Sequence, residues 1–245
     1  MKRLVVALLV LALAACGGSN TGSGSSVEGT ATLWVTRDRG AEVVLTATVP
    51  AGQTVLQALD EQAEIETRYG GRYVQAVGGL AGSLSGQQDW FYFVNGIEPD
   101  VGATEVELRP GDVAWWDFRS WEQDAEAPVV VGAFPMPFSR GWEGATRPVE
   151  LRFPPELADA ADALRPVLGG RGTGEPNVFQ LEVTSGVEGA ELTAERGPAN
   201  DAPVTFRLSG AESAVRAAAQ ALADDPAIVR YRYTARFDSS GTVVG

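Results

Sequence analysis

The sequence contains no histidine, and it has one cysteine, Cys16, and one lysine, Lys2, among its 245 residues. Nucleophilic and acid–base catalysis draw mainly on His, Cys and Lys, so Ser-His-Asp, Cys-His and Schiff-base schemes are excluded. The scheme that remains is a carboxylate pair of the glycosidase type, and Asp89, Asp112 and Asp117 lie near tryptophans. The position of each of these aspartates at a strand or a turn gives it a structural explanation as well. We therefore predict that the chain is not an enzyme and carries no cofactor.

Metal ligands are equally scarce. Zinc thiolate sites need several cysteines, and no Asp-rich loop has the spacing of a calcium site. The sequence therefore predicts no metal site.

The N-terminus has the pattern of a secretion signal. Residues 1–16 consist of two cations followed by an apolar run that is too short to span a bilayer. Their end, Leu13-Ala14-Ala15-Cys16, resembles the lipobox of bacterial lipoproteins, in which the cysteine is acylated after cleavage. We predict a signal peptide at 1–16, lipidation of Cys16, a Gly/Ser tether at 17–28, and anchoring at the extracytoplasmic face of the cell membrane.

The charge balance is strongly acidic, with a net charge of −13. Cleavage of residues 1–16 removes two cations and no acid, which lowers the net charge to −15. Binding to phosphate backbones requires clustered cations, so nucleic acid is excluded as a partner. Membrane association is expected from the lipid anchor rather than from a basic patch.

The first predicted domain covers residues 29–122. Strands are expected at 30–36, 43–49, 72–77, 90–94, 105–108 and 113–118, with a short helix after Thr54. The Asn95-Gly96 pair predicts a hairpin turn, and Pro110-Gly111 has the order of a type II turn. Two strands, a helix and then several strands suit a small α+β domain of the β-grasp kind.

The second predicted domain covers residues 128–245, after a change in composition near 122–128. Its pattern is β-α-β-β-α-β, with strands at 149–153, 179–183, 204–208 and 229–237 and helices at 155–168 and 211–223. That order is the ferredoxin-like one. The stretch 184–203 has room for an extra hairpin at 191–195. Arg230, Arg232 and Arg236 alternate along the last strand, either as a solvated face or as a contact for an anionic group or partner.

The aromatic residues concentrate in one part of the chain. Eight of the twenty lie between residues 90 and 121, and seven of these eight are in two predicted strands. One interpretation is a sheet buried on both faces, with all of these rings in the core. The other is an exposed platform formed by Trp90, Tyr92 and Trp115, because these rings offer flat apolar surfaces with polar handles. The apolar segment Phe134-Pro135-Met136-Pro137-Phe138, followed by Trp142, suits either an interdomain contact or a docking loop.

The motif from Trp90 through Asn95-Gly96-Ile97-Glu98-Pro99, followed by Leu108-Arg109-Pro110-Gly111-Asp112, resembles the bacterial DUF4430 family of transcobalamin-like C-terminal domains. The resemblance covers about residues 29–121. It implies a β-rich module that binds a ligand, with a corrinoid as the leading ligand. Animal cobalamin carriers also have a helical barrel, which this chain lacks, and without histidine the cobalt would keep its own base or water.

These observations predict a lipid-anchored extracytoplasmic protein that captures a corrinoid for uptake and passes it to a membrane transporter. Trp90, Tyr92 and Trp115 would contact the ligand face, and Asn95 and Asp112 would supply polar contacts at the turns. The alternative is a surface adhesion or interaction module that binds a glycan or a protein partner, with its aromatic residues in the core.

Overall fold

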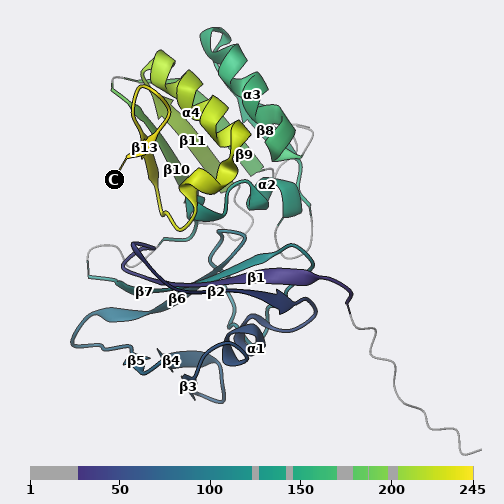
Figure 1. Cartoon of the computed structure of the whole chain (residues 1–245), viewed down its shortest axis with the longest axis vertical. Coiled ribbons are helices and arrows are strands. Elements are labelled where there is room, and N and C mark those ends of the chain that lie inside the picture. The colour runs from purple at the N-terminus through teal and green to yellow at the C-terminus, as the bar shows by residue number, and fades with distance from the viewer. Residues whose placement is uncertain are drawn as a thin grey trace, which may run out of the picture.

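The computed structural model describes residues 27–122, 127–141, 146–169, 179–186, 188–197 and 204–244. The predicted signal peptide at 1–16, Cys16, most of the tether at 17–28 and Trp142 lie outside the described residues. Within those ranges, no helix is both long enough and apolar enough to cross a membrane. The architecture is mixed α+β, as predicted (Figure 1). We call residues 27–122 the N-terminal unit and residues 127–244 the C-terminal unit.

The N-terminal unit contains two sheets and one short helix. Its elements are β1 (Thr30–Arg37), β2 (Glu42–Pro50), α1 (Val55–Asp60), β3 (Ile65–Arg68), β4 (Tyr73–Val77), β5 (Leu80–Ala81), β6 (Gln88–Val94) and β7 (Val113–Ser120). The larger sheet has the order β2-β1-β7-β6, and its central strands β1 and β7 run parallel. The smaller sheet has the order β3-β4-β5, and with α1 it lies on one side of the larger sheet (Figure 1).

Local signals explain where these elements begin and end. Thr54 caps α1 with a capping box, because its hydroxyl accepts the Gln57 backbone N–H and the Gln57 side chain accepts the Thr54 N–H. Asn95 and Gly96 both have positive φ and join Val94 to Ile97 through two backbone hydrogen bonds, as in a type I′ turn. The predicted helix and the predicted turn are therefore confirmed, but the turn is followed by an isolated bridge at Ile97 rather than by the second strand of a hairpin, because the next strand begins at Val113.

The predicted strand at 105–108 is wrong. Only Glu107 forms a bridge, with Thr54, and the backbone around it bonds to the start of α1 instead. The N–H of Val55 donates to the Val106 carbonyl at 2.9 Å, and the N–H of Leu108 donates to the Gln53 carbonyl at 2.8 Å. The first turn of a helix has N–H groups without intrahelical partners, so this extended segment satisfies them rather than joining a sheet.

The C-terminal unit has one six-stranded sheet whose order is β13-β12-β10-β11-β9-β8. Its elements are η1 (Val131–Ala133), α2 (Met136–Arg140), β8 (Val149–Arg152), η2 (Pro155–Leu157), α3 (Ala158–Leu168), β9 (Phe179–Ser185), β10 (Ala190–Arg196), β11 (Val204–Gly210), α4 (Glu212–Asp224), η3 (Pro226–Val229), β12 (Ala235–Phe237) and β13 (Val243–Val244). Helices α3 and α4 lie side by side on one face of this sheet (Figure 1).

This strand order differs from the predicted ferredoxin-like one. In the split arrangement another strand separates the two strands of a βαβ unit, whereas here β8 and β9 pair directly in parallel. Residues 191–195, considered for an extra hairpin, instead lie within one strand, β10, which pairs with both β11 and β12 in antiparallel fashion. Residues Ala190–Arg196 thus form a central strand of the sheet.

The predicted strand at 229–237 is only partly correct. Its first residue ends η3, Tyr231 has a φ of 65°, and pairing begins only at Ala235. The alternating tyrosines have another cause, since Tyr231 and Tyr233 both pack against the N-terminal unit. The alternation of Tyr231 and Tyr233 with polar residues therefore reflects packing against the larger sheet of the N-terminal unit and not pairing within a strand.

The units share an aromatic cluster. Tyr233 lies edge-on to Phe93 and to Trp115, with 5.6 Å between ring centroids in each pair. Tyr231 lies edge-on to Trp34 at 4.9 Å. The larger N-terminal sheet is consequently covered on both faces, by α1 and the small sheet on one side and by the C-terminal unit on the other.

A buried carboxylate anchors the same contact. Asp117 is fully buried, and its Oδ2 accepts hydrogen bonds from the Tyr233 hydroxyl at 2.9 Å and from the backbone N–H of Arg39 at 3.1 Å. Its Oδ1 accepts the Thr36 hydroxyl at 2.5 Å and the Gly40 N–H at 3.1 Å. Burial is the main cause that raises the pKa of Tyr233 well above its ordinary range, and the negative charge of Asp117 raises it further. The Tyr233 hydroxyl therefore stays protonated and remains a hydrogen-bond donor.

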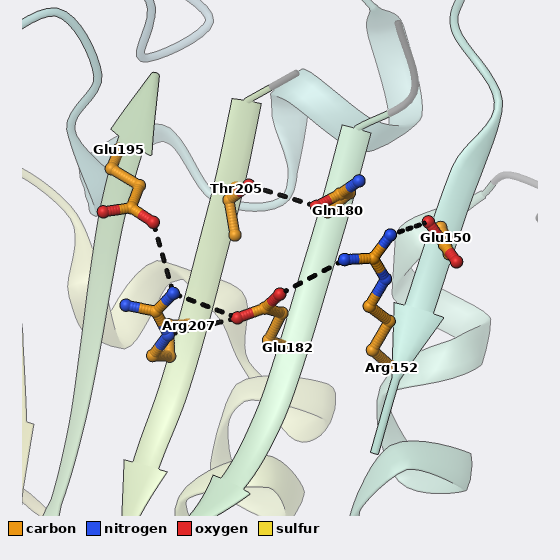
Figure 2. A network of polar contacts seen from close by, with 7 residues as sticks. All are labelled: Glu150, Arg152, Gln180, Glu182, Glu195, Thr205 and Arg207. Carbon is orange, nitrogen blue, oxygen red and sulfur yellow. Dashed lines mark hydrogen bonds and ion pairs between the residues drawn. The ribbon is translucent and has the colours of Figure 1, made fainter. Parts of the chain in front are cut away.

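The polar face of the C-terminal sheet carries a ladder of ion pairs (Figure 2). Arg207 contacts Glu182 at 3.0 Å and Glu195 at 3.2 Å, and Arg152 contacts Glu150 at 2.8 Å and Glu182 at 3.5 Å. These residues alternate along their strands with the buried side chains that face α3 and α4. The charges therefore neutralise one another across neighbouring strands.

Candidate functional site

The aromatic strands β6 and β7 direct their side chains to opposite faces of the larger sheet. Tyr92 is paired with Trp116, and the two rings stack with centroids 5.0 Å apart. Trp90 shares the face of Tyr92, because side chains alternate along a strand. Trp115 is next to Trp116 and so points to the other face. The predicted platform of Trp90, Tyr92 and Trp115 is therefore wrong, since the three rings do not share a surface.

Both of the predicted platform tryptophans belong to the core. Trp90 is 8% exposed and Trp115 is fully buried. The indole N–H of Trp90 donates to the Leu80 carbonyl at 2.9 Å, and that of Trp115 donates to the Thr36 hydroxyl at 2.7 Å. The structure thus agrees with the interpretation of a sheet buried on both faces.

Tyr92 lies at the rim of the core. Its ring is half-buried, and its hydroxyl donates to the carbonyl of Val101. Burial raises the pKa of Tyr92, and the negative charges of Glu105 and Glu98 raise it further. The hydroxyl is therefore protonated at neutral pH and holds the loop that contains Val101.

Asn95 and Asp112 form a buried pair that joins the Asn-Gly turn to the Pro-Gly-Asp turn. The Asn95 side-chain amide donates to Asp112 Oδ1 at 2.8 Å, and Asn95 Oδ1 accepts the Val113 N–H at 3.0 Å. Asp112 Oδ2 accepts the Arg109 N–H at 2.9 Å. Both residues are over 90% buried. The two turns that define the sequence motif therefore hold each other in place.

A cavity of about 360 Å³ opens beside this pair, and we call it the turn cavity. Two of the five predicted ligand-binding residues line it, Asn95 and Asp112. Its full lining is Val94, Asn95, Pro99, Val101, Glu105, Val106, Glu107, Arg109, Asp112, Arg140 and Gly141. The volume lies in the lower part of the range for small-molecule sites.

Both signs of charge line the turn cavity. Glu105 ends a turn and Glu107 follows two residues later, before Arg109, and all three are exposed. Arg140 comes from α2 of the C-terminal unit, and its guanidinium donates to the Pro110 carbonyl at 3.4 Å. A ligand that both donates and accepts hydrogen bonds would find partners for each function here.

The sequence identified one part of this lining and missed another. Tyr92 is outside it but holds Val101, which lines it, whereas Trp90 and Trp115 lie elsewhere in the core. The alternation of Glu105 and Glu107 was a usable signal. Arg140 gave none, because only the packing of the two units brings it to the cavity.

The three carboxylates considered for catalysis are all bonded within the fold. Asp89 accepts the Tyr73 hydroxyl at 2.6 Å, and Asp112 and Asp117 accept the bonds described above. Burial, together with Asp89, raises the pKa of Tyr73 to about 12. Across the described ranges, no three acidic or cysteine side chains are grouped closely enough to hold a metal ion.

Residues 52–120 match the family described as a domain of unknown function (DUF4430). The matched region contains the aromatic strands and both turns of the motif, so the resemblance found in the sequence is confirmed for this region. No curated protein matches the chain.

Several solved structures are similar to part of the chain, among them the following two. The first is described as "a putative metal binding protein" from Ruminococcus gnavus, with 17% identity and a TM-score of 0.32 over 38% of this chain and 98% of that one. The second is haptocorrin in complex with Cbi, with 19% identity and a TM-score of 0.31 over 37% of this chain. The chain spans only 24% of that haptocorrin structure.

Proposed function

We propose that this chain is a lipid-anchored extracytoplasmic protein that binds a small molecule in the turn cavity and delivers it to a membrane transporter. The observation that carries the proposal is the buried Asn95–Asp112 pair beside a cavity with both guanidinium and carboxylate groups. Preorganised polar groups of this kind orient a ligand without paying for their own ordering. The DUF4430 match supports placing the site in this module.

The N-terminal unit is proposed to be β-grasp-like. Its sheet order β2-β1-β7-β6, with a parallel central pair and one helix, supports that description. The C-terminal unit contributes Arg140 to the cavity and covers the second face of the sheet.

A corrinoid is the proposed ligand. Corrinoids carry amide arms around an apolar ring, and amides both donate and accept hydrogen bonds. Glu105 and Glu107 offer acceptors, Arg109 and Arg140 offer donors, and valines supply an apolar wall. The cavity is smaller than a whole corrinoid, so an edge of the ring with its arms would enter it. The chain has no histidine, so the metal would keep its own ligands.

Calorimetric titration of the purified full-length chain with cobinamide and cobalamin tests this proposal. We expect saturable binding with a Kd of about 1 μM or lower, corresponding to about 8 kcal/mol. Arg140→Gln should weaken binding about tenfold, whereas Arg165→Gln, the same change on the exposed surface of α3, should not. No saturable binding up to about 1 mM would reject a corrinoid ligand.

The anchor is tested separately. Wild-type cells labelled with a radioactive fatty acid should yield a labelled protein in the membrane fraction, and Cys16→Ser should abolish both the label and the membrane association. A labelled Cys16→Ser protein would contradict the proposed lipidation.

A surface interaction module is the second candidate, with a glycan or a protein as its partner. It is favoured by two large side chains at loop tips of the small sheet, Leu84 at 87% and Tyr69 at 78% exposure. Binding of the chain to a glycan array, or to an array of surface proteins, should then fall for Leu84→Ser and remain unchanged for Arg140→Gln. The reverse pattern would favour the turn cavity.

A further inference from the structure

A second cavity of about 360 Å³ lies between the two units, and we call it the Arg230 cleft. Strands β1 and β2 contribute Thr32, Trp34 and Thr46 to it. The segment from η1 to α2 contributes Pro135 and Met136, and η3 with the residues beside it contributes Asp225 and Arg230. None of these residues lines the turn cavity.

Trp34 is a buried residue with a hydrogen-bond donor that the fold does not use. The residue is 6% exposed, and its ring is held edge-on by Trp115 at 6.1 Å and by Tyr231 at 4.9 Å. Among the described residues, no acceptor bonds to its indole N–H. The Trp34 nitrogen is not among the described buried nitrogen and oxygen atoms that lack a partner, so it keeps contact with solvent, whereas the indole N–H groups of Trp90 and Trp115 are bonded within the fold.

Arg230 places a positive charge beside the Trp34 ring. Its guanidinium carbon lies 5.5 Å from the Trp34 ring centroid and 6.0 Å from that of Tyr231. In the part of the chain that the structure describes, Arg230 forms no ion pair, although the protein is strongly acidic. Ring contacts restrict a guanidinium without neutralising it, so its N–H groups remain available to an anion.

Asp225 supplies the one carboxylate among the residues that line the Arg230 cleft, and this carboxylate is already hydrogen-bonded. Asp225 caps η3, where its Oδ1 accepts the Ala227 N–H at 2.9 Å. The rest of the wall is largely apolar and includes Ala133, Pro135, Met136 and Pro226. The cleft therefore combines donors near Trp34 with an apolar wall.

The geometry points to a second binding site, in the Arg230 cleft, for a small carboxylate with an apolar body. The carboxylate accepts hydrogen bonds from the Arg230 guanidinium and the Trp34 indole N–H, and the apolar body lies along Met136 and the prolines. Hydrogen bonds between a charged donor and a charged acceptor are about twice as strong as those between neutral groups. This site does not depend on the ligand proposed for the turn cavity.

Octanoate serves as the probe, titrated by calorimetry into the full-length chain. We expect saturable binding with a Kd below about 1 mM, and at least tenfold weaker binding of octan-1-ol, which lacks the charge. Arg230→Gln should weaken octanoate binding at least tenfold. Arg165→Gln and Arg140→Gln should leave it unchanged, because they make the same charge change on the surface and in the turn cavity.

Two further variants test the chemistry of the site. Asp225→Asn keeps a good helix-capping residue and removes one negative charge, so it should tighten octanoate binding several-fold. Trp34→Phe keeps a ring and removes the donor, so it should weaken binding while its thermal unfolding shows that the variant is folded. The proposal is overturned if wild-type binding is absent, if octan-1-ol binds equally well, if Arg230→Gln or folded Trp34→Phe binds normally, or if Asp225→Asn binds more weakly.

Discussion

Tyr233→Phe is the sharpest test of how the two units are held together. The substitution keeps the ring that packs between Phe93 and Trp115 and removes the hydroxyl that donates to buried Asp117. Loss of a hydrogen bond to a charged group costs about 1.5–3 kcal/mol. Because Asp117 is fully buried, water does not replace the lost donor, and we expect a cost of about 2 kcal/mol.

Tyr231→Phe is the matched control. It removes a hydroxyl that shares an exposed hydrogen bond with Thr46 at 3.1 Å, and water can replace that partner. Its cost should stay below about 0.5 kcal/mol, as is usual for surface changes. The assay is urea unfolding followed by circular dichroism, with thermal unfolding as a second measure.

A cost of about 2 kcal/mol should lower the Tm of Tyr233→Phe by about 4–8 °C for a chain of this size. The shared aromatic cluster also predicts one cooperative transition in the wild type rather than two. Equal costs for the two Tyr→Phe variants, or separate transitions for the two units, would refute the reasoning.

Three other predictions follow from local geometry. Single Ala substitutions at Asn95 and Asp112 should each destabilise the fold by about 1–3 kcal/mol, and the double variant should cost clearly less than their sum in urea unfolding, because the two side chains bond to each other. Gly132→Ala should cost about 1–3 kcal/mol in the same assay, since the added Cβ would lie 2.7 Å from the Arg232 backbone nitrogen, and a cost near zero would contradict the packing. The pKa of Asp238 is lowered, chiefly by the side-chain hydrogen bond from Ser240. The turn that Asp238 forms with Ser240 is therefore intact above the ordinary Asp pKa, and it opens as the pH falls through the lowered pKa of Asp238. An NMR titration of the Asp238 carboxyl should therefore give a midpoint below that of an unpaired Asp.

Sequence reasoning worked best where a structure depends on a few neighbouring residues. The capping box at Thr54 and the positive φ values at Asn95 and Gly96 are local, so residue types at fixed spacing predict them. The buried alternation along β11 is equally local, since one face of that strand meets helices and the other meets water. These features established the α+β class.

The error at Trp115 has a different origin. Eighteen residues separate β6 from β7, so the sequence does not determine which residues of the two strands face the same way. The register places Trp115 opposite Phe93. The density of aromatic residues is explained by a sheet covered on both faces, which depends on the packing of distant segments.

The candidate site shows the same division. Asn95 and Asp112 were predicted as ligand contacts because they sit in recognisable turns, and they do line the turn cavity. Their main bonds, however, are to each other and to the backbone of the turns. Arg140 and Arg230 reach their cavities only through contacts between the two units, which no local pattern in the sequence encodes.

The covering of the N-terminal sheet by Tyr231 and Tyr233 also bears on how such proteins diversify. One face of the N-terminal sheet is aromatic and apolar, so this unit cannot be exchanged freely among proteins. Any protein that received it would have to supply aromatic rings and a hydroxyl donor to cover that face. Shuffling of the N-terminal unit alone would expose Trp34, Phe93 and Trp115 and favour aggregation. The two halves of this chain should therefore be inherited together, and recombination between them should be selected against.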